Sequence, residues 1–330
     1  MTPQSILHHY PLPPADRMEP LRNAGGLSGA ELWRMGVGPA EFCLRCWQVG
    51  MDHARLTAIQ RVLQHVNLSF VPVPLHTTTG ASSVVLEKRI WTLEPWLPGQ
   101  PVATPSDAQL HSAMQALADF HRAAASYPGD REFPAAQVGP PSGLARRVYL
   151  AREYLLHGAQ KLMQANIPTR WQELQTRRAR LLPLIAAVAP RLLSDVEQLL
   201  SLAIPQQICL RDVWSAHLLY SGDEVTGLID FDALRVDSVA TDLARLLASY
   251  LADDRPRWEV ALDIYQALRP LSQHERGLVF AYDRFATLLT GMQWLDWILL
   301  QAKEFAPETV LARVDATLCR LEHLRDRLRI

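Results

Sequence analysis

The stretch that decides the fold reads Cys209-Leu-Arg-Asp-Val-Trp-Ser-Ala-His-Leu-Leu-Tyr220, and Thr226-Gly-Leu-Ile-Asp-Phe-Asp232 follows it closely. Each part carries an aspartate after an apolar run, Asp212 in the first and Asp230 in the second. Ser221-Gly-Asp223 is a turn signal, so residues 207–232 are expected to form two short strands joined by a turn. Strands arranged in this way can deliver both carboxylates to one cleft.

Composition bounds the class of protein. The chain has 330 residues, and at roughly 100–200 residues per domain this length predicts two domains or lobes. A hydrophobic fraction of 48% and a charged fraction of 20% provide a sizeable core. The net charge of −1 offers no field that would attract nucleic acid or a membrane surface. We therefore expect a globular protein with neither as a partner.

The termini and cysteines indicate the compartment. The N-terminal residues lack the basic and apolar segments of a signal peptide, and no window has the length of apolar residues that a transmembrane helix needs. The four cysteines are too few for a disulfide scaffold, so a cytoplasmic location is expected. Cys43-Leu-Arg-Cys46 has no second ligand pair for zinc. We interpret Cys43 and Cys46 as ordinary strand residues.

Hydrophobic periodicity divides the chain near residue 97. Before this point, short alternating runs at 31–35, 41–47, 83–87 and 90–94 predict strands, and 54–66 predicts a helix. After it, the pattern is mostly helical, at 107–125, 142–155, 171–203 with interruptions at Pro183 and Pro190, 237–251, 272–300 and 311–328. The fold class is therefore α+β, with a small β-rich lobe over residues 1–96 and a large helical lobe over residues 97–330.

The spacing of the acidic residues is typical of phosphoryl transfer. Protein kinases place the catalytic carboxylate in H-R-D-x-x-x-x-N and a metal ligand in D-F-G. Leu210-Arg-Asp212 corresponds to the first motif, and His217 stands where that motif has its asparagine. Asp230-Phe-Asp232 corresponds to the second. The pair predicts a base at Asp212 and a metal ligand at Asp230.

Taken together, these motifs resemble the aminoglycoside phosphotransferase family, which includes homoserine-kinase-like and choline-kinase-like members. Further segments match the family in order along most of the chain. They are Gly25-Gly-Leu-Ser-Gly29, Phe42-Cys-Leu-Arg45, Glu94-Pro-Trp-Leu-Pro-Gly99, Leu117-Ala-Asp-Phe-His121, Gly227-Leu-Ile-Asp-Phe231, Thr241-Asp-Leu-Ala244 and the region from Tyr265 to Glu275. The resemblance implies a two-lobed protein-kinase-like fold that moves the γ-phosphoryl group of ATP to a hydroxyl of a small molecule.

The resemblance also implies roles for single residues. Asp212 would be the catalytic base, and Asp230 the main ligand of Mg²⁺. Arg45 would pair with the α- and β-phosphates. The phosphates would be covered by Gly26, Ser28 and Gly29, and the adenine pocket would be lined by Glu94 and Trp96 through backbone groups. Asp242 would hold the catalytic loop, and His121 would be a core residue.

The chain departs from the family pattern at two places. An asparagine supplies a hard oxygen for Mg²⁺, whereas the imidazole of His217 suits softer metals. The second metal position is therefore left open between His217 and Asp232, with Mn²⁺ as an alternative ion. Residues 51–66 contain no glutamate to pair with Arg45. These departures keep a second hypothesis open, a catalytically degenerate kinase fold that binds nucleotide or acts as a regulator.

The acceptor is not legible in the sequence. Aminoglycosides would require an acidic pocket, and choline an aromatic one. The acids available in the large lobe are Asp253, Asp254, Asp296 and Glu304, and the aromatic residues are Trp294, Trp297 and Phe305. We interpret the three aromatic residues as helix core.

Overall fold

The computed structural model describes residues 3–21 and 29–329. Contacts between residues divide the chain into two compact units, of which the first comprises residues 1–136 and 210–236 and the second residues 137–209 and 237–330. The lobe boundary at residue 96 stays a prediction, because compactness alone does not define a catalytic lobe. Among the described residues, no helix combines the length and the apolar character needed to cross a bilayer.

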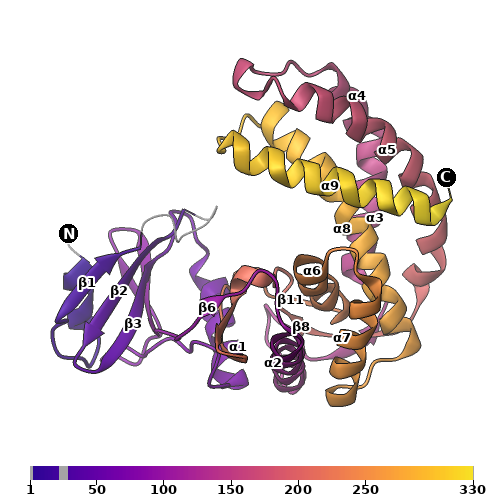
Figure 1. Cartoon of the computed structure of the whole chain (residues 1–330). Coiled ribbons are helices and arrows are strands. Elements are labelled where there is room, and N and C mark those ends of the chain that lie inside the picture. The colour runs from indigo at the N-terminus through magenta and orange to yellow at the C-terminus, as the bar shows by residue number, and fades with distance from the viewer. Residues whose placement is uncertain (1–2, 22–28, 330) are drawn as a thin grey trace. The chain divides into compact units, whose positions relative to one another are not determined.

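An antiparallel sheet forms the N-terminal part of the first unit, with its strands in the order β1-β2-β3-β5-β4. Figure 1 labels β1, β2 and β3 of this sheet. The strands are β1 (Arg17–Pro20), β2 (Glu31–Val37), β3 (Ala40–Cys46), β4 (Val84–Leu86) and β5 (Arg89–Pro95). A 3₁₀ turn, η1 (Pro3–His9), packs its Ile6 and Leu7 against Met35, Leu44 and Leu93 of the sheet. The strands predicted between residues 31 and 94 are confirmed.

Side chains alternate between the two faces of β3 because the strand has a period of two residues. Phe42, Leu44 and Cys46 are buried, whereas Cys43 and Arg45 belong to the opposite face and are partly exposed. Cys43 and Cys46 therefore point to different faces, and neither is in a disulfide. The interpretation of the C-x-x-C as two ordinary strand cysteines is confirmed.

Helix α1 (His53–Val66) follows the sheet strand β3. The side chain of Asp52 caps its N-terminus by accepting a hydrogen bond from the backbone N–H of Ala54 at 2.9 Å. The helix ends at Asn67, whose left-handed backbone conformation closes the last turn. Its buried face carries Ile59 and Leu63, at the spacing that the sequence predicts.

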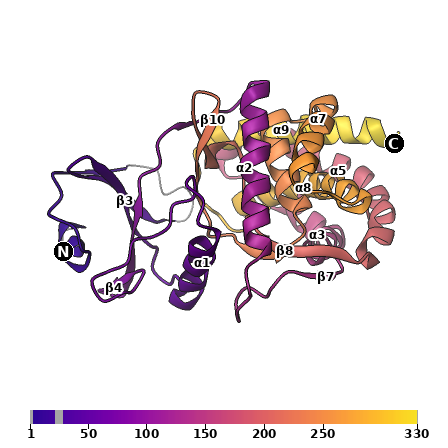
Figure 2. The same ribbon diagram turned by 90° about the horizontal axis from the view of Figure 1, so that it is seen from below.

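The first unit also contains a small second sheet with strands in the order β10-β9-β6. The elements are β6 (Gln100–Pro101), α2 (Asp107–Ala125), the 3₁₀ turn η5 (Ser215–His217), β9 (Leu218–Ser221) and β10 (Glu224–Leu228). The predicted hairpin of residues 207–232 is thus confirmed over 218–228. Figure 2 shows α2 beside β10, where the Ser112 hydroxyl accepts a hydrogen bond from the Val225 backbone N–H at 2.9 Å.

Gly99 is required where β6 meets β9. Its φ is +110°, and a Cβ there would lie 2.7 Å from the carbonyl oxygen of Tyr220. Only glycine adopts this conformation without strain and lets the two backbones approach so closely. The glycine therefore allows β6 to pair with the hairpin that precedes Asp230.

The second unit is a helical assembly with a short antiparallel pair, β7 (Gln137–Gly139) and β8 (Ile204–Cys209). Its helices are α3 (Ser142–Glu153), α4 (Ala159–Gln164), α5 (Leu174–Val196), α6 (Ala240–Leu251), α7 (Arg255–Leu268), α8 (Gln273–Leu299) and α9 (Pro307–Leu328). Short turns of other helix types cover Tyr154–Gly158, Thr169–Trp171 and Glu197–Ser201. Strand β11 (Arg235–Asp237) crosses the boundary between the units. Helix α8 contacts α3, α5, α6 and α9, so it is the centre of this unit.

The predicted interruptions at Pro183 and Pro190 are wrong, because α5 runs through both. Each proline removes one backbone hydrogen bond. The helix nevertheless buries a continuous apolar face that contacts α8 and α9, and this packing outweighs the lost bonds. The predicted capping box of α8 is confirmed, since the Ser272 hydroxyl accepts from the Glu275 N–H at 3.1 Å and the Ser272 N–H donates to the Glu275 carboxylate at 2.9 Å.

Candidate nucleotide and metal site

A pocket of about 200 Å³ lies within the first unit. Its walls come from β3, β5, α1 and the segment after β10, and the predicted site residues among them are Arg45, Glu94, Trp96, Asp230 and Asp232. Ile59, Leu63 and Leu97 make part of the lining apolar. Because a cavity of roughly 150 Å³ holds benzene, the pocket has room for a flat ring system somewhat larger than benzene.

Arg45 is the cation of this pocket. Its guanidinium lies 3.8 Å from Asp232 Oδ1 and 4.7 Å from the centre of the Trp47 ring. Burial lowers the pKa of Arg45, but the nearby Glu94 and Asp232 outweigh burial and raise this pKa overall, so the group remains charged. The acids that face Arg45 therefore come from β5 and from the segment after β10. They take the place of the glutamate that residues 51–66 lack.

Glu94 faces the same pocket from β5, where it pairs with Cys43 of β3. The Thr92 hydroxyl donates to the Glu94 carboxyl at 3.5 Å. Burial raises the pKa of Glu94, and Arg45 acts in the opposite direction. The sequence suggested a backbone role for this residue, whereas the structure places its side chain among the charged groups of the pocket.

The backbone of Trp96 is already engaged. Its N–H donates to the carbonyl oxygen of Glu41 at 2.9 Å, which extends the pairing of β5 with β3. The Trp96 N–H is therefore not directed at a ligand, so any backbone contact of this residue with adenine would have to use its carbonyl oxygen. Arg34 stacks on the Trp96 ring at 4.6 Å from its centre.

Asp230 and Asp232 follow β10 and bring two carboxyl groups to the pocket. Burial raises the pKa of Asp232 to about 6, an effect that Arg45 opposes and that the negative charges of Asp230 and Glu94 increase. Among the described residues that line the pocket, three carboxyl groups thus share one guanidinium. This excess of negative charge and oxygen atoms suits a hard divalent cation such as Mg²⁺.

His217 contacts Asp230 but its ring nitrogen is also used elsewhere. Its Nε2 lies 3.4 Å from Asp230 Oδ2 and accepts a hydrogen bond from the indole Nε1–H of Trp214 at 2.8 Å. An indole N–H is only a donor, so Nε2 is the unprotonated nitrogen of a neutral imidazole. Coordination of a metal through Nε2 would require Trp214 to move away, which favours Asp230 and Asp232 as the oxygen ligands.

Asp212 lies on the exposed side of its loop, between the buried Leu210 and Val213. Arg211, directly before it, has φ +70°, and so does Asp230. Left-handed backbone at residues other than glycine costs free energy and often occurs at functional sites. Both loops that carry the predicted catalytic and metal-binding aspartates contain such a residue.

The remaining predicted residues belong to the glycine-rich segment. Gly26 and Ser28 lie outside the described residues, while Gly29 is described and has φ +72°. The prediction that this segment covers phosphates remains a prediction. Sequence reasoning missed Cys43 and Gln60, which also line the pocket. Cys43 is two residues from Arg45 in β3 and so shares its face, which could have revealed Cys43 as a lining residue. Nothing in the sequence pattern of α1 indicates Gln60.

Comparison with known proteins places this site in context. The sequence profile of the phosphotransferase enzyme family matches residues 21–280. The chain is similar to a homoserine kinase from Mesorhizobium japonicum, with 23% identity over 302 residues that cover 89% of this chain and 85% of that protein. The family profile spans both the pocket residues and Asp212.

Solved structures share the fold. An aminoglycoside phosphotransferase from Alicyclobacillus acidocaldarius has a TM-score of 0.63 at 19% identity and covers 100% of this chain and 97% of its own. An AMP-bound spectinomycin phosphotransferase has a TM-score of 0.69 at 11% identity, with 98% and 94% covered. The predicted protein-kinase-like fold, with a small β-rich lobe and a large helical lobe, is confirmed. The protein is a small-molecule kinase, and the chain belongs to the phosphotransferase enzyme family.

Proposed function

We propose that the protein binds ATP together with Mg²⁺ and transfers the γ-phosphoryl group to a hydroxyl of a small molecule. The observation that carries this proposal is the pocket in which Arg45 faces Glu94, Asp230 and Asp232. A cation for phosphate groups and oxygen ligands for a divalent ion are the parts that phosphoryl transfer requires. The family match supports phosphoryl transfer as the reaction.

In this proposal the apolar part of the pocket holds the nucleotide base, and Arg45 binds its phosphates. Its contact with the Trp47 ring fixes the direction of the guanidinium. Asp230 and Asp232 hold Mg²⁺, which neutralises the negative charge that develops on the phosphates. His217 acts through its contact with Asp230, which limits the positions open to that carboxylate.

Asp212 orients the acceptor and takes its proton. The bond between the γ-phosphorus and the bridging oxygen breaks and leaves ADP, while a new bond forms between phosphorus and the acceptor oxygen. The hydroxyl proton passes to the Asp212 carboxylate, whose exposed position lets it reach a bound alcohol. Positioning and charge neutralisation supply most of the rate in reactions of this class.

Choline and aminoglycosides lose support as acceptors from the side chains of the helical unit. The ring of Trp297 is covered by Lys303 at 4.6 Å, and that of Trp294 by Arg313 at 5.6 Å, so these aromatic faces are already used by the chain's own cations. Asp254 caps α7 by accepting from the Arg257 N–H at 3.3 Å. The similarity to a homoserine kinase makes homoserine the first acceptor to test.

The experiment is a pair of variants measured by nucleotide binding and by ADP release. Asp230→Asn removes the main metal ligand and should abolish metal-dependent nucleotide binding. Asp212→Asn should leave binding intact and stop turnover. The assays should cover ATP and GTP with Mg²⁺ or Mn²⁺, using homoserine, choline and aminoglycosides as acceptors. Full phosphoryl transfer by Asp212→Asn would overturn the role of Asp212, and wild-type binding without turnover for any acceptor would support the degenerate alternative.

A further inference from the structure

A second pocket, of about 150 Å³, lies within the helical unit. Its walls come from α3, α6, α8 and α9. A cavity of this size holds a molecule of roughly the size of benzene. It therefore suits a ligand, or the end of one, with few non-hydrogen atoms.

Charge sets this pocket apart from the first one. Its walls carry Arg147 of α3, Arg245 of α6 and Arg320 of α9, and none of the described residues that line it is acidic. Arg245 is exposed at the surface of α6, while Arg147 and Arg320 are half-buried. Guanidinium groups that converge on one cavity favour an anion as the ligand.

Arg147 is held in place before any ligand arrives. Its Nη1 donates to the carbonyl oxygen of Gly143 at 3.2 Å, and its Nη2 to the Thr241 hydroxyl at 3.1 Å. The guanidinium also lies 4.6 Å from the centre of the Tyr282 ring. A cation fixed by these contacts loses little freedom on binding an anion, which increases affinity.

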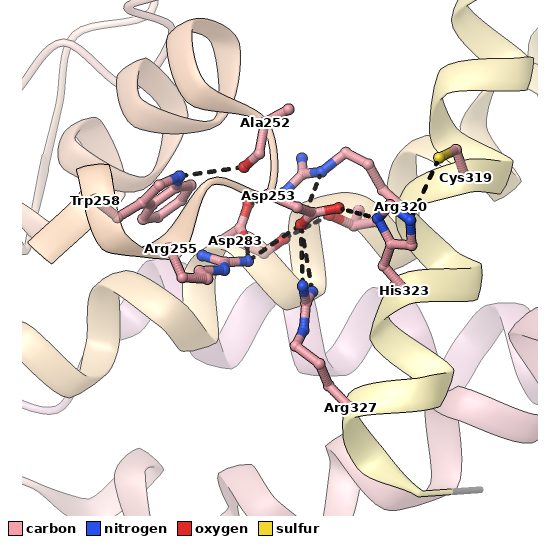
Figure 3. A network of polar contacts seen from close by, with 10 residues as sticks. Ala252, Asp253, Arg255, Trp258, Asp283, Cys319, Arg320, His323 and Arg327 are labelled. Atoms are coloured by element: carbon pink, nitrogen blue, oxygen red, sulfur yellow. Dashed lines mark hydrogen bonds and ion pairs between the residues drawn. The ribbon is translucent and has the colours of Figure 1, made fainter.

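Arg320 is positioned from behind by an ionic network, shown in Figure 3. Its Nη2 donates to Asp283 Oδ1 at 2.6 Å, and Arg255 donates to the other oxygen of the same buried carboxylate at 2.6 Å. Asp253 lies 3.7 Å from Arg320 Nε and also pairs with Arg327. The network thus sets three guanidinium groups against two carboxylates, which leaves net positive charge beside the pocket.

Threonine hydroxyls give the pocket a second character. The Thr287 hydroxyl donates to the carbonyl oxygen of Asp283 at 3.0 Å, and the Thr317 hydroxyl donates to that of Arg313 at 2.8 Å. With these protons committed, the oxygen atoms are left to accept hydrogen bonds. A ligand in this pocket gains from an anionic group for the arginines and a hydroxyl or amino donor for the threonines.

We propose that this pocket binds a small carboxylic acid that also carries a hydroxyl or amino group. A carboxylate matches the planar fork of a guanidinium, and the donor matches the threonine oxygens. In this proposal the acid binds whether or not a nucleotide is present. If the bound acid is the phosphoryl acceptor, this assignment names the acceptor class, and that part rests on the proposed function.

The test is calorimetric titration of the full-length protein, without nucleotide, with L-glycerate, L-homoserine, glycerol and inorganic phosphate. Glycerol is the counterpart of glycerate that lacks the carboxylate, so it should bind at least about tenfold more weakly, the loss expected for one charge-assisted contact. Arg147→Gln and Arg245→Gln should each weaken binding of the acid by about tenfold. The neighbouring exposed Arg146, which does not line the pocket, provides the control Arg146→Gln with unchanged affinity.

Arg245→Gln guards against a folding artefact, because its side chain is exposed. Absence of binding by either acid, equal binding of glycerol, or binding of phosphate alone would overturn the proposal. Addition of ATP and Mg²⁺ then distinguishes two roles of the bound acid. A bound acid that becomes phosphorylated is the acceptor, and one that stays unmodified is an effector of a separate site. Asp230→Asn should lose nucleotide binding and keep the acid, so failure of the catalytic proposal remains distinguishable.

Discussion

The indole N–H of Trp214 donates to His217 Nε2, the same nitrogen that lies 3.4 Å from Asp230 Oδ2. One side chain thus occupies the lone pair through which the imidazole would bind a metal. The histidine that replaces an asparagine in this motif is therefore held away from metal coordination by its neighbour three residues earlier.

Removal of the indole donor should change metal preference. In Trp214→Phe the Nε2 lone pair of His217 becomes available, and imidazole nitrogen prefers later transition metals over Mg²⁺. The affinity for Co²⁺ should rise several-fold while that for Mg²⁺ stays nearly constant. Titration of Co²⁺ followed by its visible absorption measures this. In the matched variant His217→Asn, the added Trp214→Phe change should have no such effect, and an equal response in both backgrounds would contradict the mechanism.

Arg45 should contribute to nucleotide affinity through its charge. Arg45→Met removes a charge-assisted contact of about 1.5–3 kcal/mol, so the dissociation constant for ATP should rise at least tenfold. Arg45→Lys keeps the charge and should change it by only a few-fold. Equilibrium binding of a fluorescent ATP analogue measures both. Arg89→Met, which alters an arginine of β5 that does not line the pocket, is the control, and an equal loss in this variant would show a general effect on the sheet.

Gly143 leaves room for a buried carboxylate in the helical unit. A Cβ at Gly143 would lie 2.0 Å from Asp237 Oδ2, and Asp237 is fixed by the Tyr282 hydroxyl at 2.7 Å and the Ser238 N–H at 2.9 Å. Gly143→Ala should therefore lower the free energy of unfolding by about 1–3 kcal/mol. Gly277 is its control, because nothing lies within 4 Å of a Cβ there. Gly277→Ala should raise stability by about 0.5–1 kcal/mol, as judged by urea denaturation, and similar losses in both variants would refute the packing argument.

Asp130 should make the first unit sensitive to acid. Partial burial pushes the pKa of Asp130 upward, but the Phe133 N–H and the Arg61 guanidinium outweigh it and lower this pKa to about 2. Because the folded pKa is below the unfolded value of about 3.9, the carboxylate stabilises the fold above that value. This contribution is lost as the pH falls toward 2.

The variant Asp130→Asn tests this dependence. Its melting temperature should be lower than that of the wild type at pH 7, and the difference should shrink as the pH is lowered from 5 to 3. Arg61→Met should reproduce part of the loss at pH 7, because it removes the 2.7 Å hydrogen bond to the same carboxylate. A difference between wild type and Asp130→Asn that grows on acidification would contradict the assignment.

The sequence predicted the elements whose signals are local. The hairpin at 218–228 follows from its turn residues, and α8 from the capping box at Ser272. The course of α5 through Pro183 did not follow, because the packing that overrides a proline comes from helices far away in the sequence. Local propensity fails where distant contacts supply more free energy than the local break costs.

The motifs named the aspartates Asp212 and Asp230, whose roles stay predictions, but not the side chains around them. Motif spacing points to Asp212 and Asp230 because they stand where the kinase motifs have the catalytic carboxylate and the metal ligand. The side chain of Glu94 in the pocket depends on the register of β5 with β3, which no motif reports. The hydrogen bond from Trp214 to His217 depends on rotamers within a turn, and no residue pattern encodes that choice.

The alternation of side chains along β3 places a thiol in the pocket that contains Arg45. Cys43 lines the pocket, and burial raises the pKa of its thiol to about 12, so it stays protonated and reacts slowly at neutral pH. The alkylation rate of Cys43 should fall when a molecule binds beside Arg45, because the bound molecule would cover the sulfur. The alkylation rate of the exposed Cys319, which lies in the other unit, provides the internal control for this protection.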